Sequence, residues 1–311
     1  MASSKIAVYS ALFANLAIAV TKFIAAGITG SSAMVSEGIH SVVDTGNEVL
    51  LLLGIHKSNR PPDAKRPFGY GKDLYFWSFI VSLLIFAVGA GISFYEGVTH
   101  LQHPTIIKNP FWNYVVLGFA LIFDGISFFV ALRQFNKERG DQSFWQAVKQ
   151  SRNPTNFVVL FEDAADVSGL LIALAGVWLG HYFQNAYFDG AASIMIGFIL
   201  TGVAVVLARE SYSLLMGETA SPQVLKDVVH ITAQDRDVIT VSDPLSMFMG
   251  PEEIVLVLYV VFRNNLTTQQ INGSVARIQE NITKPYPYFK RILIQPATAI
   301  NGQMVETDLR T

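Results

Sequence analysis

The sequence contains no cysteine among its 311 residues, so disulfide bonds, thiolate metal ligands and cysteine nucleophiles are excluded. It also carries little charge: 15% of its residues are Asp, Glu, Lys or Arg, whereas 51% are hydrophobic. This balance is typical of a membrane protein. The net charge of −2 offers no basic surface for nucleic acid. We therefore expect a lipid bilayer as the chain's main partner and no nucleic-acid partner.

Long apolar runs are what the sequence has in abundance. A helix needs ~20 apolar residues to cross a bilayer, and six runs reach that length: 6–28, 33–55, 74–98, 112–132, 156–179 and 188–208. The first run is too long for the apolar part of a cleavable signal and lacks a small-residue cleavage pattern. We predict six transmembrane helices, of which this run is the first.

The distribution of Lys and Arg predicts the orientation of these helices. The connections after the second and fourth runs are basic, whereas the opposite connections hold only Lys108. The basic residues are Lys57, Arg60, Lys65, Arg66 and Lys72 in one connection and Arg133, Lys137, Arg139, Lys149 and Arg152 in the other. We therefore predict that both basic connections and both termini lie in the cytoplasm, and we expect the membrane to be the inner membrane of a bacterium.

The composition changes after residue 215, where apolar runs shorten and charges and turn residues become frequent. We predict a transmembrane domain over residues 1–215 and a small cytoplasmic α+β domain over residues 216–311. Its first helix starts at Ser221 and Pro222, and its second is capped by Thr267 or Thr268. Strands are predicted at 238–249, 253–262 and 288–295. This α-β-β-α-β order predicts a ferredoxin-like or metallochaperone-like fold with both helices on one face of a sheet.

Two of the apolar runs carry a pair of potential metal ligands, and such ionisable residues are costly at membrane depth. His40 and Asp44 are four residues apart in one, and Glu162 and Asp166 are four apart in the other. Each pair therefore lies one turn apart on one helix face. Because the two helices run in opposite directions, His40 is expected level with Asp166 and Asp44 level with Glu162. We predict a four-ligand metal site; the alternative is separate polar residues satisfied by neighbouring helices.

Two further carboxylates lie in the same kind of surroundings. Asp163 points about 100° away from Glu162 around the helix, so we expect it to orient a ligand or belong to a proton path rather than to bind metal. Asp124 lies in the fourth run and is a second candidate for a proton path. The alternative for such a residue is a hydrogen bond to a neighbouring hydroxyl or helix end.

Several motifs resemble those of the cation diffusion facilitators, which exchange divalent metals for protons. They are residues 36–44 (SEGIHSVVD), 68–72 (FGYGK), 162–166 (EDAAD), 189–191 (DGA) and 214–218 (LLMGE). The resemblance covers nearly the whole chain and implies six helices followed by a cytoplasmic metallochaperone-like domain. Residues 68–97 are similar to the branch of the animal mitochondrial zinc exporter. By this resemblance, His40, Asp44, Glu162 and Asp166 occupy the family's four transport-site positions.

The resemblance implies zinc as the transported cation and no permanently bound cofactor. Many zinc-exporting members have His where Glu162 stands, so this site offers one nitrogen and three carboxylates. Such a set suits tetrahedral zinc and also tolerates manganese, iron or cobalt. The family's second, cytoplasmic site is not expected, because Arg66 and Tyr70 stand at its positions beside Asp63. The C-terminal domain has one histidine, His230, so its usual metal sites are not expected either.

The family's members dimerise, so the resemblance also implies a homodimer. Because the usual metal ligands are missing, we expect it to be held by other contacts. One candidate is an apolar sheet face built from Val255, Val257, Tyr259 and Val261; the alternative is that this face packs on the domain's own helices. A second candidate is an ionic contact between Lys72 and an acid near the end of the sixth helix, Glu210 or Glu218.

Three classes of function compete. The first, which we expect, is a secondary transporter rather than an enzyme: it exports a divalent cation in exchange for protons by alternating access. The second is an intramembrane metallohydrolase, but the sequence has no His-Glu-x-x-His motif and no second histidine near the site. The third is a metal-sensing or scaffolding membrane protein that has the fold without the flux. The complete ligand set favours the first.

Overall fold

The computed structural model describes residues 2–104, 110–151, 154–297, 299–300 and 303–304. Lys108 and Arg152, which contributed to the predicted orientation, lie outside the described residues. The chain forms two compact units. One comprises Met1–Lys57 and Asp73–Tyr212, and the other comprises Ser58–Lys72 and Ser213–Thr311.

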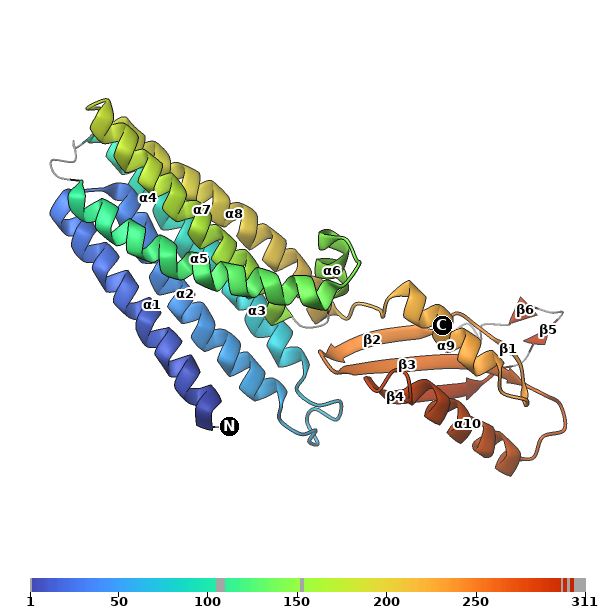
Figure 1. Cartoon of the computed structure of the whole chain (residues 1–311). Coiled ribbons are helices and arrows are strands. Elements are labelled where there is room, and N and C mark those ends of the chain that lie inside the picture. The colour runs from blue at the N-terminus through green and yellow to red at the C-terminus, as the bar shows by residue number, and fades with distance from the viewer. Residues whose placement is uncertain (1, 105–109, 152–153, 298, 301–302, 305–311) are drawn as a thin grey trace. The chain divides into compact units, whose positions relative to one another are not determined.

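The first unit is a bundle of long helices (Figure 1). They are α1 Ala2–Thr29, α2 Ser32–Ser58, α3 Lys72–Leu84, a π-helical segment Ile85–Ala90, α4 Gly91–Gln102, α5 Phe111–Arg139, the short α6 Phe144–Gln150, α7 Pro154–Tyr182 and α8 Tyr187–Met216. The bundle end where α1 turns into α2, and α7 into α8, is called the turn end below. Gly30 makes the first of these turns with a φ of 72°, which glycine adopts without strain.

Three helical segments of the described chain are long and apolar enough to cross a membrane: Lys72–Gln102, Phe111–Lys137 and Tyr187–Met216. The apolar helical segment Asn15–Thr29 of α1 is shorter than these three. Many large apolar side chains of these segments face outward; Phe119, for example, is 62% exposed. An apolar exterior of this kind is what a lipid environment requires. The predicted count of six membrane-crossing helices remains a prediction.

The third predicted helix differs from expectation in its middle. Residues 85–90 form a π-helical segment between α3 and α4, where one continuous α-helix was predicted. The widened turn contains Gly89, and a Cβ at that position would lie 3.4 Å from Leu200 of α8. Small residues of this kind permit close helix approach. Helix α6 was not predicted; Ser143 begins it with a capping box to Gln146.

The second unit contains α9 Pro222–Ala233, α10 Thr268–Thr283 and a four-stranded sheet. The strands are β1 Val238–Val241, β2 Leu245–Gly250, β3 Glu253–Phe262 and β4 Phe289–Pro296; a separate short pair is β5 Ala299–Ile300 and β6 Gln303–Met304. Strand β3 pairs with β1 and β2 antiparallel and with β4 in parallel. The caps predicted at Ser221 and Thr267 are confirmed: their side chains accept hydrogen bonds from the backbone of Val224 and Gln270.

The single strand predicted over 238–249 was wrong, because the chain breaks it into β1 and β2. Asp243 and Pro244 lie at the break. Proline has no N–H to donate to a sheet, and it also restricts the residue before it. Both pieces still pair with β3, β1 with its end at Phe262 and β2 with its start at Glu253. Up to β4, the element order of this unit is therefore α-β-β-β-α-β.

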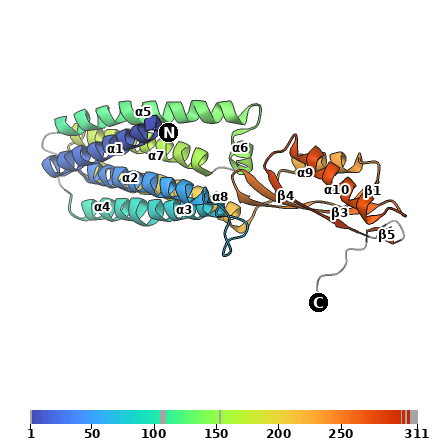
Figure 2. The same ribbon diagram turned by 90° about the horizontal axis from the view of Figure 1, so that it is seen from below.

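One face of this sheet carries the core of the second unit. Ile254, Leu256, Leu258 and Val260 of β3 are fully buried, and Figure 2 shows α9 and α10 on the same side of the sheet. Alternate residues of a strand point to opposite faces. The other face is therefore formed by the intervening residues of β3.

The opposite face is apolar and less covered. Val255, Val257 and Tyr259 are half-buried there. The strand register places Leu245 and Leu293 beside Val257, and these two leucines are 59% and 56% exposed. Val261, which was predicted to share this face, is buried instead. It pairs with Thr240 of β1, next to a register shift between Val238 and Thr240.

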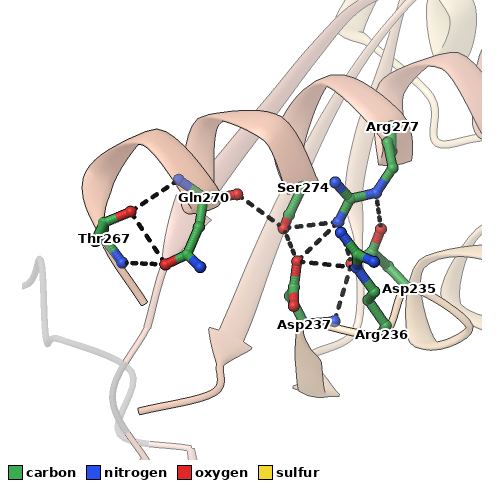
Figure 3. A network of polar contacts seen from close by, with 7 residues as sticks. All are labelled: Asp235, Arg236, Asp237, Thr267, Gln270, Ser274 and Arg277. Carbon is green, nitrogen blue, oxygen red and sulfur yellow. Dashed lines mark hydrogen bonds and ion pairs between the residues drawn. The ribbon is translucent and has the colours of Figure 1, made fainter. Parts of the chain in front are cut away.

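A polar network fastens α10 to the turn that precedes β1 (Figure 3). Arg277 donates to Asp235 at 3.0 Å and to Asp237 at 2.8 Å, and the Ser274 hydroxyl donates to Asp237 at 2.7 Å. Ser274 and then Arg277 hold the pKa of Asp237 below its ordinary value. Figure 3 also shows the capping box at Thr267 that begins α10.

The segment between α2 and α3 belongs to the second unit and explains the FGYGK motif. Arg291 of β4 donates to the carbonyl of Pro67 at 2.8 Å and lies 4.9 Å from the centre of the Phe68 ring. A Cβ at Gly71 would collide with the backbone of Met249 and Gly250, so only glycine fits.

Asp63, in the same segment, is engaged by its own loop. Its carboxylate accepts hydrogen bonds from the Tyr70 hydroxyl at 2.6 Å and from the backbone of Lys65 and Arg66. The Tyr70 hydroxyl, followed by these backbone groups, holds the pKa of Asp63 below its ordinary value.

Candidate metal centre

Three of the four predicted ligands meet between α2 and α7. Nε2 of His40 lies 2.8 Å from Oδ1 of Asp166, and Nδ1 lies 3.5 Å from Oδ1 of Asp44. One ligand atom of each residue lies within 4.8 Å of those of the other two. The His40 side chain is 1% exposed, and the two aspartates are 14% and 15% exposed. A cation at this point would be held by one nitrogen and at least two oxygens; these three residues are called the ligand group below.

The ligand atoms are not used up by the protein itself. Both ring nitrogens of His40, Oδ1 of Asp44 and Oδ1 of Asp166 are buried without a hydrogen-bond partner among the described residues. The contact between His40 and Asp166 is an ion pair of 2.8 Å. Buried polar atoms are nearly always partnered. Several unpartnered ligand-type atoms converging on one point fit a cation, which needs them all.

Glu162, the fourth predicted ligand, is held apart from the ligand group. It lies one turn before Asp166 on α7 and is 7% exposed. Its Oε1 accepts a hydrogen bond of 2.8 Å from the side-chain amide of Asn47, which is fully buried on α2. Asn47 lies three residues after Asp44 on α2, about one turn, and was not among the predicted site residues.

A cavity reaches the ligand group. It is lined by Asn15, Ile18, Ser41, Asp44, Asp124 and Asp166. Asp124 of α5 therefore shares a cavity with two ligands, and its role in proton movement stays a prediction. Asp163 accepts a hydrogen bond of 2.9 Å from Ser127 of α5. It is thus attached to α5, and its role as an orienting or proton-path residue also stays a prediction.

A carboxylate from α8 fixes the start of α2. Asp189 is buried and accepts hydrogen bonds from the Ser31 hydroxyl at 2.6 Å and the Ser32 hydroxyl at 2.9 Å, as well as from the Ser32 backbone. Nε2 of His100 lies 3.8 Å away. A carboxylate at a helix N-terminus satisfies free N–H groups and suits the helix dipole. Asp189 opens the DGA motif and so sets where α2, with its ligands, begins.

A buried lysine near the site is the largest surprise for sequence reasoning. Lys22 of α1 is fully buried, and its ammonium lies 3.2 Å from Oε2 of Glu37 and donates to the Ser41 hydroxyl at 2.8 Å. The signal that could have found it was a lone basic residue inside the apolar run of residues 6–28. Glu37, which belongs to the SEGIHSVVD motif, is fully buried as well.

The residues predicted to form an ionic contact with Lys72 belong to different units. Lys72 and Glu218 belong to the second unit and Glu210 to the first. The Glu218 carboxylate accepts a hydrogen bond from Ser213 at 3.2 Å. The ammonium of Lys72 approaches Gly217, 3.5 Å from where a Cβ would stand. An ionic contact between Lys72 and either glutamate stays a prediction.

Known proteins similar to this chain are transporters of metal cations. Residues 8–216 match the family model of the cation efflux transmembrane domain. The chain is 34% identical over 250 residues to the proton-coupled zinc antiporter SLC30A9, mitochondrial, of Xenopus laevis, covering 80% of this chain and 45% of that protein. For the protein of the same name in Homo sapiens the identity is 33% over 267 residues, covering 83% and 47%.

A bacterial relative is matched along its length. The manganese efflux system protein MneP of Bacillus subtilis is 22% identical over 293 residues, which are 91% of this chain and 92% of MneP. In contrast, the chain spans less than half the length of the two animal relatives.

Proposed function

Since this chain belongs to the cation efflux family, whose transmembrane model it matches over residues 8–216, we propose that it exports a divalent metal cation in exchange for protons. The resemblance indicated by the motifs is confirmed at the level of the family. The relatives compared above are named as an antiporter and an efflux protein. We propose that this chain, too, is a transporter and not an enzyme.

The observation that carries the proposal is the convergence of His40, Asp44 and Asp166 in one buried group. Zinc in proteins takes four ligands in tetrahedral geometry. We propose Glu162 as the fourth. To bind the cation, the Glu162 carboxylate must break its hydrogen bond with the Asn47 amide and rotate toward the ligand group, whose Asp166 lies one helical turn further along α7. When no cation is bound, Asn47 keeps the Glu162 carboxylate hydrogen-bonded away from the other ligands.

The exchange of cation for protons follows from charge. Three carboxylates and a neutral imidazole together carry −3, which a low-dielectric site does not hold without a compensating cation. The cation-free site therefore takes up protons, and a divalent cation that needs deprotonated ligands displaces them. If the site opens alternately to the two sides of the membrane, the cation leaves on one side as protons return. Asp124 lines the cavity at the ligand group and is proposed to pass those protons.

Zinc is proposed as the first substrate and manganese as the second. Two observations support zinc: the single imidazole in the ligand group and the similarity to the two animal zinc antiporters. Two others support manganese: the excess of carboxylate oxygens, which harder cations prefer, and the similarity to the bacterial manganese efflux protein. Iron and cobalt fall in the same range of ligand preference. The cation is cargo, and no resident cofactor is proposed.

We propose six membrane-crossing helices in residues 1–215, with both termini in the cytoplasm, and a cytoplasmic domain in residues 216–311. The positions of Lys and Arg support this orientation. The family model ends at residue 216, close to the proposed domain boundary. For the membrane we propose the bacterial inner membrane, which the full-length match to the Bacillus subtilis relative supports.

We also propose that the chain works as a homodimer. The support is the uncovered apolar sheet face of the second unit, with Leu245 and Leu293 exposed beside Val257. Exposed apolar patches of this kind mark interaction sites.

Reconstitution into proteoliposomes tests the function. Zinc added to one side should enter only while protons leave, as followed by a metal dye and a pH dye inside the vesicles. Replacing His40, Asp44, Glu162 or Asp166 by alanine should abolish both fluxes, because four-coordination has no spare ligand. Asp141→Asn, the same kind of change at an exposed position outside the long helices, should leave both fluxes unchanged. Wild-type flux in any two of the four alanine variants would overturn the four-ligand site.

A further inference from the structure

Two charged side chains are fully buried beside the ligand group without belonging to it. Lys22 of α1 and Glu37 of α2 form an ion pair of 3.2 Å, with both side chains 0% exposed. Ionisable groups inside a membrane-crossing bundle are costly and mark functional sites. A pair of apolar residues would fill the same space at lower cost. The pair therefore needs an explanation beyond packing.

The pair lies on the turn-end side of the ligand group. Glu37 comes three residues before His40 on α2, about 4.5 Å along the axis toward the turn end. The second partner of Lys22, Ser41, directly follows His40. Lys22 thus reaches across from α1 and contacts α2 on both sides of a metal ligand.

Helix α7 closes against this pair. Gly169 follows Asp166 by three residues, toward the turn end of α7. A Cβ at Gly169 would collide with Oε1 of Glu37, so a larger residue there would displace the Glu37 carboxylate. That oxygen has no hydrogen-bond partner among the described residues. Three helices therefore meet at Glu37 with no room between them.

The cavity lies on the other side. Besides the ligands, it is lined by Asn15 and Ile18 of α1, which precede Lys22 by seven and four residues. Both lie on the side of Lys22 that faces away from the turn end. The ligand group is thus open toward a cavity on one side and faces the Lys22–Glu37 pair on the other.

We propose that Lys22 and Glu37 form the turn-end gate of the transport path. While they are paired and Glu37 packs on Gly169, a cation at the ligand group has no route to the turn end. When the pair separates and α1 and α7 move away from α2, that route opens, and Lys22 withdraws as a tethered cation that repels a returning metal. This inference deepens the proposed function by assigning two residues to one step of the transport cycle.

Labelling of an introduced cysteine tests the gate without any metal flux, because the chain has no cysteine of its own. Ser41 lines the cavity, and Ser41→Cys is a small change in volume. His181→Cys, exposed at the last turn of α7, identifies the turn-end side of a vesicle. A membrane-impermeant thiol reagent is then applied from each side in turn.

With the pair intact, the thiol of the Ser41→Cys variant should react from the cavity side and at least about tenfold more slowly from the turn-end side, as expected when one conformation dominates. The double variant Lys22→Met, Glu37→Gln removes both charges together, so neither is left buried alone. It should raise the turn-end rate about tenfold. The charge swap Lys22→Glu, Glu37→Lys should slow it again. An elution profile in detergent unchanged from the parent confirms that each variant is folded.

Equal labelling from both sides in the parent, or an unchanged turn-end rate in the neutral double variant, would overturn the gate. A role of the pair in stability alone would lower the unfolding temperature without changing the sidedness of labelling. Because the labelling needs no transport, it separates this inference from the proposed function. If zinc flux is absent but the sidedness responds, the proposed function fails and the gate stands; if flux is normal but the sidedness does not respond, the gate fails alone.

Discussion

His40 shows how closely the site depends on single residues. Its two ring nitrogens face two different carboxylates, Asp166 across the helix interface and Asp44 on its own helix. As the single nitrogen donor in the proposed set, it is also the residue that favours zinc over harder cations. Metal choice should therefore depend on how many nitrogens the site contains, and Glu162 is the position at which this number can be changed.

Replacing Glu162 by histidine should shift the preference toward zinc and cadmium and away from manganese. The variant offers two nitrogens and two carboxylates, a softer set that borderline and soft cations prefer. Competition between zinc and manganese for uptake into proteoliposomes measures the shift. Glu162→Gln, which keeps an oxygen but loses the charge, is the matched control and should weaken both metals without reversing their order. An unchanged ranking in Glu162→His would mean that Glu162 does not bind the transported cation.

At this scale the sequence predicted the ligands but not their partners. His40, Asp44, Glu162 and Asp166 could be found because an i, i+4 spacing in an apolar run is visible in one helix. Asn47 meets Glu162 across 115 residues of chain, and Ser31 meets Asp189 across 158. Such contacts depend on which helices pack together, and hydrophobic patterns alone do not specify that.

Among the elements, α2 depends most on a contact made by another helix. Its first turn is capped by Asp189 from the start of α8. Asp189→Ala should lower the free energy of unfolding by about 1–3 kcal/mol, because it leaves buried donors unsatisfied. Thermal unfolding in detergent, followed by tryptophan fluorescence, measures it. Asp189→Asn keeps one acceptor and should lose less; equal stability of Asp189→Ala and the parent would show that the cap does not hold α2.

A hydrogen bond between α9 and the turn before β4 predicts a dependence on alkaline pH. The Tyr286 hydroxyl donates to Asp227 of α9 at 2.6 Å, and this hydrogen bond raises the pKa of Tyr286 to about 12. A raised pKa means that the contact stabilises the fold fully below the unfolded value of about 10 and is lost as pH rises through 12. In an absorbance titration, Asp227→Asn should move one tyrosine from near 12 toward 10, and Tyr286→Phe should remove it. An identical titration in wild type and Asp227→Asn would contradict this assignment.

Element ends were more predictable than element interiors. Ser221 and Thr267 were identified as caps because a capping side chain and the residues that follow it are local in sequence. The break between β1 and β2 carried a local signal in Pro244, but the apolar pattern on either side suggested one strand. The π-helical turn at residues 85–90 had no comparable local signal.

At the scale of the whole molecule, the division into two units differs from the predicted domain boundary, and one unit exposes an apolar sheet face. Residues 58–72 pack with the second unit although they connect two helices of the first. The predicted boundary near residue 215 did not anticipate this, because a sequence-based boundary assumes contiguous domains. Among the described residues of the second unit, no helix covers the sheet face around Val257. Asp235 and Asp237 of this unit are both paired with Arg277.

We therefore predict a homodimer that persists in chelator. Light scattering of the detergent-solubilised protein, with and without chelator, should give the same dimeric mass. Leu245→Glu combined with Leu293→Glu places charges on the exposed face and should shift the mass toward the monomer. Ile239→Glu, a matched change at a residue 59% exposed on β1, is the control. Dissociation on removal of metal would reveal a bridging metal site instead.

One imidazole and three carboxylates between α2 and α7 are proposed to bind the cation. X-ray absorption at the zinc edge, on protein loaded with one zinc per chain, reports these donors. We predict one nitrogen and three oxygen donors at about 2.0–2.2 Å, with the imidazole signal lost in His40→Ala and unchanged in His230→Ala. Two or more imidazoles, an octahedral shell of water, or a spectrum unaffected by His40→Ala would contradict the account.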